Sequence, residues 1–319
     1  MTKTALMIGA TGGIGNAMTQ SLLDHDWQVR ALHRNPDQAR TKFSHLSSVE
    51  WVNGDAMNEA DVVNAAQGAD IVVHAANPPG YKNWHGLAVP MLENSIVAAT
   101  SVGARLVFPG NVYNYGPDAW PLVSEASPQN PRTRKGAIRV EMEQMLQQAA
   151  EQGARVLVVR AADFFGANAP GSWFQSVIVK PGQKIKAVTY PGRHDVGHAW
   201  AYLPDLAETI ACLVDRDDEL GAFEVFNFGG HYFARGGELA DAIKQVASVP
   251  DAATKSMPWI ALYIAAPFVS LFREILEMRY LWKIDLRLDN SKLVEFLGAE
   301  PHTPLDRALK STLISLECI

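Results

Sequence analysis

Ala5-Leu6-Met7-Ile8-Gly9-Ala10-Thr11-Gly12-Gly13-Ile14-Gly15 is the stretch that decides the fold. It begins as an apolar strand, breaks into a glycine-rich turn, and continues as a helical pattern with Ile14, Met18 and Leu22 on one face. A strand, a glycine turn and a helix in this order open a βαβ unit and predict a turn that binds phosphate. A plain turn is the alternative interpretation of the glycines taken alone.

The three spaced glycines of this turn have separate predicted functions. Gly9 permits a sharp exit from the strand, Gly12 lets the backbone approach a pyrophosphate, and Gly15 lets the helix pack on the sheet. The first amides of the helix and its positive end then face the anion. The residues expected to bind a dinucleotide here are Gly9, Thr11, Gly12, Gly13, Ile14 and Gly15.

Length, charge and cysteine content limit the function classes. The chain has 319 residues, 48% of them hydrophobic, which is enough for one large domain with a smaller lobe. A formal charge of −6 and the lack of a basic run argue against a nucleic-acid partner. Cys212 and Cys318 are too few and too distant for a disulfide framework or a metal site, so we expect no metal and a reducing cytoplasm. The N-terminus lacks the pattern of a signal peptide.

Apolar strands alternate with helical stretches through the first half of the chain. This order is typical of an α/β fold in which helices cover both faces of a doubly wound parallel sheet. Strands are predicted at Leu6–Ile8, Val29–Leu32, Val49–Asn53, Ile71–His74, Arg105–Phe108 and Val156–Arg160.

The residues after the second strand bear on the choice of cofactor. His33 and Arg34 stand where an acidic residue would hold the ribose hydroxyls of NAD. Positive charge and a planar guanidinium suit a 2′-phosphate instead, so the sequence favours NADP(H), with NAD(H) as the alternative. A solvated loop arginine is the other interpretation of Arg34.

Two further strand ends carry candidate cofactor contacts. After the third strand, Asp55 offers a carboxylate to the adenine amino group and Ala56 follows it, although a turn or helix cap suits Asp55 nearly as well. After the fourth strand, Ala75 and Ala76 precede Asn77, and such small residues let a ligand lie flat over the edge of the sheet.

Taken together, these motifs resemble those of the extended short-chain dehydrogenase/reductase family, a group that includes epimerases, dehydratases and carbonyl reductases. The resemblance covers nearly the whole chain. It implies a Rossmann fold, a nicotinamide cofactor, and two alanines, Ala161 and Ala162, under the nicotinamide. Later landmarks that match the family lie at Val112 to Gly116, Arg160 to Gly166, Tyr202 to Ala207, Phe226 to Gly230, and Leu288 to Gly298.

The chain departs from the family at the active site. The family has a Ser or Thr at the end of the fifth strand, where this chain has Asn111, and a Tyr-x-x-x-Lys on the next helix. Lys135 matches the lysine, but Pro131 stands four residues before it, so the chain is similar to an atypical branch without the tyrosine. Lys135, on a helix expected at Arg132–Glu151, is expected to reach the nicotinamide ribose. An exposed helix lysine is the alternative.

Without that tyrosine, another group must move the proton. Alternation along the strand end places Asn111 and Tyr113 on the same side, which makes Tyr113 the preferred donor and Asn111 a group that polarises a substrate oxygen. Asp163 can serve as an acid or base if Phe164 and Phe165 desolvate it. A packed aromatic for Tyr113 and a loop cap for Asp163 are the alternatives.

The composition turns toward Gly, Pro and aromatic residues after Ala167. We predict a dinucleotide-binding domain and a smaller C-terminal α+β substrate lobe. The first is expected to cover residues 1–165 with a return segment at 198–225, and the second residues 166–197 and 226–319.

The stretch Met257–Phe272 is apolar and has no charged residue. It is shorter than a bilayer span, and Pro258 and Pro267 interrupt it. Burial in the lobe is expected, with an apolar lid or a contact with a membrane surface as alternatives.

Three functions remain open from the sequence. Few charges lie in the segments expected to form the pocket, which favours a small, largely apolar carbonyl or enone substrate and an NADP-dependent oxidoreductase of the cytoplasm. We expect a small-molecule partner and no membrane contact, and we allow for a homodimer. The alternatives are an epimerase or isomerase that keeps its cofactor bound, and a non-catalytic NADP-binding redox sensor, which the missing tyrosine motivates.

Overall fold

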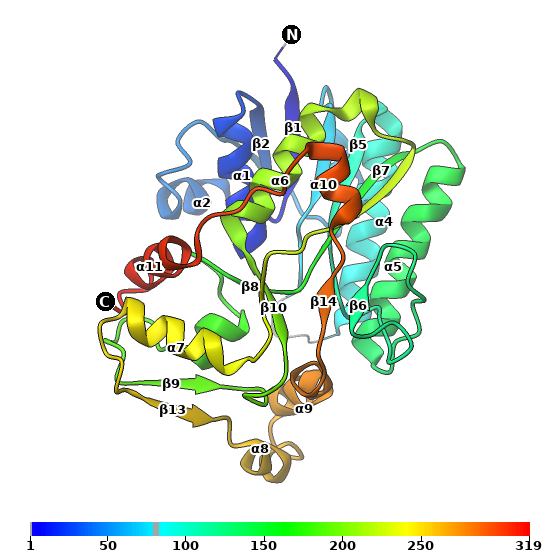
Figure 1. Ribbon diagram of the computed structural model, residues 1–319. Helices are drawn as coiled ribbons and strands as arrows, with labels where there is room; N and C mark the ends of the chain where they lie inside the picture. Colours follow the sequence, from blue (N-terminus) through cyan, green and yellow to red (C-terminus); the bar gives the residue numbers. More distant parts are fainter. Residues whose placement is uncertain (1, 79–82) are drawn as a thin grey trace.

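A parallel sheet of seven strands forms the centre of the computed structural model, which describes residues 2–78 and 83–319 (Figure 1). The strands lie in the order β11-β7-β5-β4-β1-β2-β3. The doubly wound α/β fold expected from the sequence is therefore confirmed, and each of the six predicted strands is present. The strand bounds are Thr4–Ile8 (β1), Gln28–His33 (β2), Glu50–Asn53 (β3), Ile71–His74 (β4), Arg105–Asn111 (β5), Arg155–Ala161 (β7) and Phe223–Asn227 (β11).

Helices cover both faces of this sheet because its strands are apolar on both sides. Successive residues of β1 point to opposite faces, so Met7 packs on the same side as Met18 of α1, whereas Leu6 packs on the same side as Leu92 of α4. The first face is covered by α1 (Gly13–Asp24), α2 (Pro36–Lys42), α6 (Leu203–Asp215) and α10 (Ser291–Leu297), and the second by α3 (Glu59–Ala65), α4 (Trp84–Val102) and α5 (Arg134–Glu151).

The sheet grows in two directions from β1. The chain passes from β1 to β2 and β3 on one side, then crosses back to β4 and β5 on the other side. In doubly wound sheets, ligands bind outside the carboxyl ends of the strands at this reversal. The glycine turn after β1 and the residues that follow β4 both lie there, because Ile8 and His74, the last residues of β1 and β4, are paired in the sheet. The fold therefore places the predicted dinucleotide turn where such a ligand would bind.

The remaining segments form small sheets and helices beside these carboxyl ends. β8 (Asp163–Phe165) pairs in parallel with β10 (His198–Tyr202), and β10 pairs in an antiparallel manner with β12 (His231–Phe233). The other small pairs are β9 (Ala187–Tyr190) with β13 (Ala253–Ser256) and β6 (Leu122–Val123) with β14 (Arg287–Leu288). The helices of this part are α7 (Gly237–Val246), α8 (Trp259–Ala265), α9 (Ser270–Glu277) and α11 (Leu305–Ser315), with short helical turns at Phe174–Ile178, Asp217–Glu219 and Met278–Lys283.

The segment 198–225, predicted to return to the dinucleotide-binding domain, contains elements of both parts. Its first strand, β10, lies in the three-stranded sheet, whereas α6 packs on the face of the central sheet that α1 covers. It ends inside β11, which pairs with β7 at the edge of the central sheet. The predicted division of the chain into two domains stays a prediction.

The uncharged stretch Met257–Phe272 is not buried as expected. Leu262 and Ala266 are buried, but Ile264 is 70% exposed and Phe268 is 88% exposed. The short helix α8 lies at the end of the molecule opposite the N-terminus (Figure 1), so only one of its sides has protein to pack against. Among the helices of the described residues, none is both long enough and apolar enough to cross a bilayer.

Candidate functional site at the carboxyl edge of the sheet

The glycine turn has the geometry of an anion site at a helix N-terminus. α1 starts at Gly13, and Gly12 precedes it as the N-cap with its amide donating to the Gly9 carbonyl oxygen at 3.0 Å. No described side chain caps this helix, and its first turn holds no acidic residue. Its first amides are therefore available to an anionic ligand, and no negative side chain in the first turn opposes one.

The three spaced glycines differ in the space around them. A Cβ at Gly15 would lie 2.1 Å from the Gly9 carbonyl oxygen, and one at Gly9, whose φ is +97°, would lie 2.6 Å from the Ala75 carbonyl carbon. A Cβ at Gly12 would meet only the Gly9 oxygen, at 3.4 Å. Gly9 and Gly15 are thus required by the fold, whereas the space beside Gly12 is open. An open cradle bounded by amides fits the pyrophosphate of a dinucleotide.

The other residues predicted in this turn lie beside it. A Cβ at Gly13 would lie 3.2 Å from the Ala169 Cα, so the segment after β8 closes over one side of the turn. Thr11 is partly exposed, and Ile14 packs its side chain against the apolar cluster of the α1 face. The segment after β8 therefore meets the glycine turn directly.

His33 and Arg34 stand at the carboxyl end of β2, as predicted. The Nδ1 atom of His33 lies 2.8 Å from the Asn35 carbonyl oxygen, and its ring contacts Trp51 edge-on. The Arg34 side chain is exposed, while its carbonyl oxygen accepts a hydrogen bond from Asn53 Nδ2 at 3.1 Å. The local turn is held by backbone and imidazole contacts, which leaves the guanidinium in solvent beside the ribose end of the predicted site.

Asp55 takes the turn role that was the alternative to an adenine contact. Its Oδ1 accepts from the Met57 amide at 3.0 Å, and its own amide donates to Asp61 Oδ2 at 2.9 Å. The Ala56 carbonyl oxygen accepts from Asn94 Nδ2 at 2.9 Å, which ties this turn to α4. A carboxylate with one oxygen in a turn still has an oxygen for an adenine amino group.

Ala75, Ala76 and Asn77 follow β4 beside the glycine turn. The Ala75 amide donates to the Ile8 carbonyl oxygen at 2.8 Å, and both alanines are partly exposed. Asn77 Oδ1 accepts from Trp84 Nε1 at 2.8 Å, so this amide side chain also anchors the start of α4. The alanine surface therefore faces the same edge as Gly9.

The strand alternation that placed Tyr113 beside Asn111 does not hold. β5 ends at Asn111, and Asn111 Oδ1 accepts from the Tyr113 amide at 2.9 Å, so the chain bends there instead of continuing as a strand. Tyr113 packs against an apolar cluster that includes Val112, Ala162 and Met278. The side-chain oxygen of Asn111 therefore already accepts one hydrogen bond within this turn. The catalytic roles predicted for both residues stay predictions.

Lys135 lies in the first turn of α5. The helix starts at Arg134, two residues later than predicted, because Thr133 caps it by accepting a hydrogen bond from the Gly136 amide. Its side chain is 1% exposed, and its Nζ pairs with the carboxylates of Glu274 and Glu277 on α9, the latter at 2.8 Å. Glu277 also accepts from the Lys135 amide at 2.9 Å. The exposed-lysine alternative is therefore wrong.

This arrangement favours the ionised form of the Glu274 carboxylate. Burial raises the pKa of Glu274, but the hydrogen bond and charge of Lys135, with those of Arg134, outweigh burial and hold that pKa below its ordinary value. A buried ammonium and two carboxylates thus form a compact charged group where α9 meets the N-terminus of α5.

Asp163 pairs with His198, which sequence reasoning missed. Its Oδ2 lies 2.9 Å from His198 Nε2, joining β8 to β10, and the His198 ring stacks on Trp282 with centroids 4.3 Å apart. The two side chains are 11% and 4% exposed. Asp163 is therefore partly buried with an imidazole as its partner, and its predicted role as an acid or base stays a prediction. An imidazole and a carboxylate in contact can hold and pass one proton.

Tyr280 is a second residue that the sequence did not single out. Its hydroxyl is buried and makes no hydrogen bond of good geometry with any described residue, although Thr133 lies close enough to lower its pKa. Burial is the main influence and raises the pKa of this phenol, and the negative charges of Asp163 and Glu277 raise it further. The ring stacks on Trp120 with centroids 5.9 Å apart. The phenol is therefore protonated at neutral pH and lies near enough to Asp163 and Glu277 for their charges to act on it.

Ala161 and Ala162, predicted to lie under the nicotinamide, are buried. Ala161 is the last residue of β7, and Ala162 follows it. Ala162 belongs to the same apolar cluster as Tyr113 and Tyr280. The cluster thus brings together residues from the segments that follow β5, β7 and α9. The only sequence signal for Tyr280 and His198 was their place in aromatic-rich stretches, which does not reveal their contacts with Asp163.

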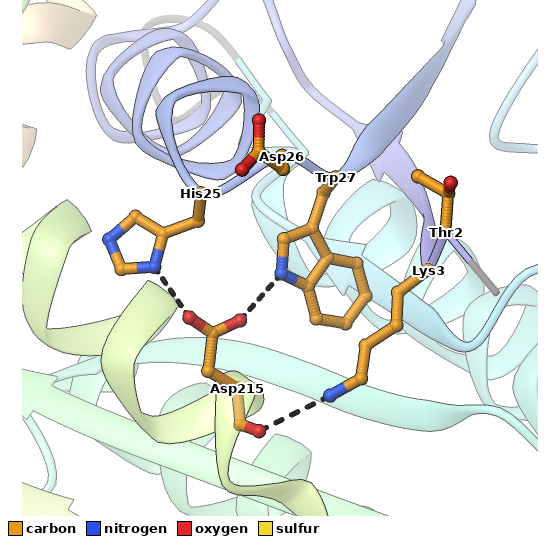
Figure 2. A pocket seen from close by; sticks show the side chains of 6 residues that line it. All are labelled: Thr2, Lys3, His25, Asp26, Trp27 and Asp215. Carbon is orange, nitrogen blue, oxygen red and sulfur yellow. Dashed lines mark hydrogen bonds and ion pairs between the residues drawn. The ribbon is translucent and has the colours of Figure 1, made fainter.

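A hollow at the opposite edge of the sheet has a structural role. Figure 2 shows it between the start of β1, the end of α1 and the end of α6, with Asp215 at its centre. Asp215 accepts from Trp27 Nε1 at 2.8 Å and lies 2.6 Å from His25 Nδ1, while Lys3 donates to its carbonyl oxygen at 3.2 Å. Because ligands of such sheets bind at the carboxyl ends, this amino-end hollow is not the cofactor site.

Two groups of metal-ligating residue types occur among the described residues. They are His25 with Glu208 and Cys212, and Asp205 with His231 and His302. In each group the carboxylate already bonds within the protein: Glu208 lies 3.0 Å from His25 Nε2, and Asp205 accepts from the amide and hydroxyl of Thr303. The expectation that the protein binds no metal stays a prediction.

Comparison with protein families places most of the chain in one group. A family model described as the NAD dependent epimerase/dehydratase family matches residues 5–229. A curated relative, the NmrA-like family domain-containing oxidoreductase notA of Aspergillus sp. (strain MF297-2), is 37% identical over 68 residues. That match covers 21% of this chain and 20% of the relative.

Solved structures share the fold over nearly the whole chain. A putative epimerase from Burkholderia cenocepacia J2315 is 17% identical, with a TM-score of 0.76 and coverage of 99% of this chain and 98% of the other. UDP-glucose 4-epimerase from Bifidobacterium longum, in complex with NAD+ and UDP, is 18% identical, with a TM-score of 0.75 and coverage of 98% and 97%. At these identities, the structures show a common fold.

Proposed function

The chain belongs to the NAD dependent epimerase/dehydratase family, and we propose that it is an NADP-dependent oxidoreductase. It transfers a hydride between the nicotinamide and a small, largely apolar carbonyl or enone substrate. The observation that carries this proposal is the convergence, at the carboxyl edge of the sheet, of the open Gly12 cradle and the group formed by Asp163, His198 and Tyr280.

NADP(H) is the proposed cofactor on the strength of Arg34. The exposed guanidinium stands at the end of β2, where an acid would repel a 2′-phosphate. His33 adds a second donor nearby, although its Nδ1 is engaged with Asn35. Structures that share the fold hold NAD, including that of Bifidobacterium longum, so binding of NAD(H) is the alternative.

The proton is proposed to move through this chain's own side chains. A nicotinamide dinucleotide supplies hydride transfer when bound. Tyr280 stays protonated at neutral pH because its pKa is raised, so it can donate to a substrate oxygen, and the Asp163 and His198 pair can return the proton. Asn111 and Tyr113 remain the alternatives as the oxygen-polarising group and the donor. Lys135 positions the ribose by exchanging a carboxylate of α9 for a sugar hydroxyl.

The apolar surroundings support an apolar substrate. Trp173 and Trp282 meet edge-on with centroids 5.1 Å apart, and Trp120 stacks on Tyr280 near the same residues. Arg160, the cation nearest this cluster on β7, is paired with Glu143 at 2.5 Å and donates to the Tyr115 hydroxyl at 2.6 Å. A sugar nucleotide would require cations for its phosphates, and this arginine is already engaged inside the protein.

NADPH oxidation across a panel of aldehydes, ketones and enones tests the proposal. We expect at least one apolar member to be reduced above the rate without substrate, and NADPH to bind in its absence. Binding of NADPH without turnover of any member supports the non-catalytic redox sensor instead, which Pro131 in place of the family tyrosine already motivates. A cofactor that copurifies and is never released would favour the epimerase or isomerase. A cytoplasmic location and a small-molecule partner are part of the same proposal.

A further inference from the structure

An apolar surface at α8 and α9 is unusual for this molecule. Of the twelve large hydrophobic residues that are exposed among the described residues, half fall within twelve consecutive positions. Phe268 is 88% exposed and Ile260 is 78% exposed, whereas scattered exposed hydrophobics are normal on soluble proteins. We call this surface the apolar tip, and its residues are Ile260, Tyr263, Ile264, Phe268, Val269 and Leu271.

The apolar tip is held firmly on the rest of the protein. Trp259 Nε1 donates to the Pro191 carbonyl oxygen at 2.8 Å, and Leu262 is buried beneath α8. The Arg279 guanidinium lies 5.1 Å from the Trp259 ring and 5.3 Å from the Tyr263 ring, and donates to the Tyr263 hydroxyl at 3.2 Å. These contacts fix the inner side of α8, so the outer side stays presented to solvent.

The charges around the apolar tip are opposite in sign to the chain as a whole. The segment 252–284 carries four basic residues and two acidic ones, with Asp251 and Asp285 directly beyond its ends, although the chain has a net charge of −6. The two acids, Glu274 and Glu277, turn inward to Lys135. Lys255, Arg273 and Lys283 are exposed, so the rim of the apolar tip presents positive charge.

We propose that the apolar tip docks on the surface of an anionic lipid bilayer. An apolar face with basic residues at its margin inserts to the level of the headgroups, where an exposed aromatic ring such as that of Tyr263 is favoured. The rim cations then attract anionic headgroups. A second copy of this chain fits less well, because a two-fold contact through the tip would bring the two positive rims together. This proposal replaces the expectation from sequence that there is no membrane contact.

Docking would also bring the candidate site close to lipid. α9 carries Leu271 in the apolar tip and, within two turns, the carboxylates that hold Lys135. An apolar substrate dissolved in the bilayer would therefore meet the protein near its site. The docking itself does not require the proposed reaction, because it rests on the surface alone.

Vesicle cosedimentation of the full chain tests the proposal. We expect binding to vesicles of phosphatidylcholine mixed with phosphatidylglycerol at about three to one, weak binding to phosphatidylcholine alone, and weaker binding at high salt. The double variant Ile264→Ser with Phe268→Ser should lower the partition coefficient about tenfold or more. Lys255→Gln with Lys283→Gln should lower it on anionic vesicles only.

Matched variants keep the outcome interpretable. Ile314→Ser removes an apolar side chain that is 56% exposed on α11, outside the tip, and should leave vesicle binding unchanged. If the double variant does not fold, Phe268→Ser alone replaces it, because that side chain is the most exposed. Absence of vesicle binding, or equal binding by the tip variants, overturns the proposal. The proposal is also overturned if the parent protein does not bind vesicles and forms a dimer that the tip variants dissociate. That result would assign the tip to contact with a second copy of the chain.

Discussion

Gly12→Val should abolish dinucleotide binding and leave the protein folded, whereas Gly15→Ala should damage the fold itself. The two positions are three residues apart in the same turn. At Gly12, φ is −83° and ψ is 169°, a conformation that valine adopts readily, and the added Cβ meets only the Gly9 carbonyl oxygen at 3.4 Å. At Gly15, the added Cβ would lie 2.1 Å from that same oxygen.

The magnitudes follow from these distances. Valine at Gly12 fills the cradle and displaces a phosphate from the first amides of α1. Each lost hydrogen bond to a charged group costs about 1.5–3 kcal/mol, so the loss of two weakens binding by roughly 100-fold or more. Its effect on folding should stay within about 1 kcal/mol, since a weaker N-cap and a stiffer unfolded chain act in opposite directions. Alanine at Gly15 forces the backbone to move, at a cost of about 1–3 kcal/mol or more.

Two measurements separate these effects. Differential scanning fluorimetry without ligand should give Gly12→Val a melting temperature within about 4 °C of the parent and Gly15→Ala a clearly lower one. Titration with NADPH, followed by nicotinamide fluorescence, should then show saturable binding by the parent and none by Gly12→Val. Unchanged NADPH affinity in a folded Gly12→Val protein would refute the assignment of this turn to the pyrophosphate.

Three further predictions concern single side chains. Arg34→Ala should remove most of the preference for NADPH over NADH, about 1–3 kcal/mol, and equal affinities for the two cofactors in the parent would contradict it. Tyr280→Phe should lower turnover by roughly 10²–10⁴-fold with little change in NADPH affinity, and Tyr113→Phe is the matched control. A larger loss of turnover in Tyr113→Phe than in Tyr280→Phe would return the donor role to Tyr113. Burial lowers the pKa of His25, but hydrogen bonds with Asp215 and Glu208 outweigh it and raise that pKa. The stabilisation is therefore complete below the unfolded pKa of about 6.5 and is lost as the pH rises through the folded value, so His25→Gln should lower the melting temperature most in mildly acidic buffer.

The fold could be predicted because its determinants are local. Each predicted strand is a short apolar run, and the glycine turn fixes where the first of them ends. The helix start was misplaced by two residues because Thr133, rather than a residue before Arg132, caps α5. Such cap positions depend on one hydrogen bond and are poorly marked in the periodicity.

The candidate site was only partly predictable because its contacts join distant segments. Asp163 meets His198, and Lys135 meets Glu274, across separations that no periodicity encodes. The argument for Tyr113 relied on strand alternation, which stops at Asn111 because that side chain bonds back to the Tyr113 amide. Polar residues at strand ends commonly make such turns, and these end the alternation on which the inference depended.

Pro131 and the carboxylates of α9 together determine which groups surround the ammonium of Lys135. With a proline in place of the family tyrosine, the start of α5 brings no phenol to the site, and the segment 274–280 instead supplies two carboxylates and Tyr280 from the other part of the chain. An ammonium that is 1% exposed would be strongly destabilising without a charged partner. A ribose hydroxyl carries no charge, so it can replace one carboxylate but not both. If Lys135 holds the cofactor ribose as proposed, binding would therefore be an exchange of partners, in which α9 would release one glutamate while the other keeps the buried charge balanced.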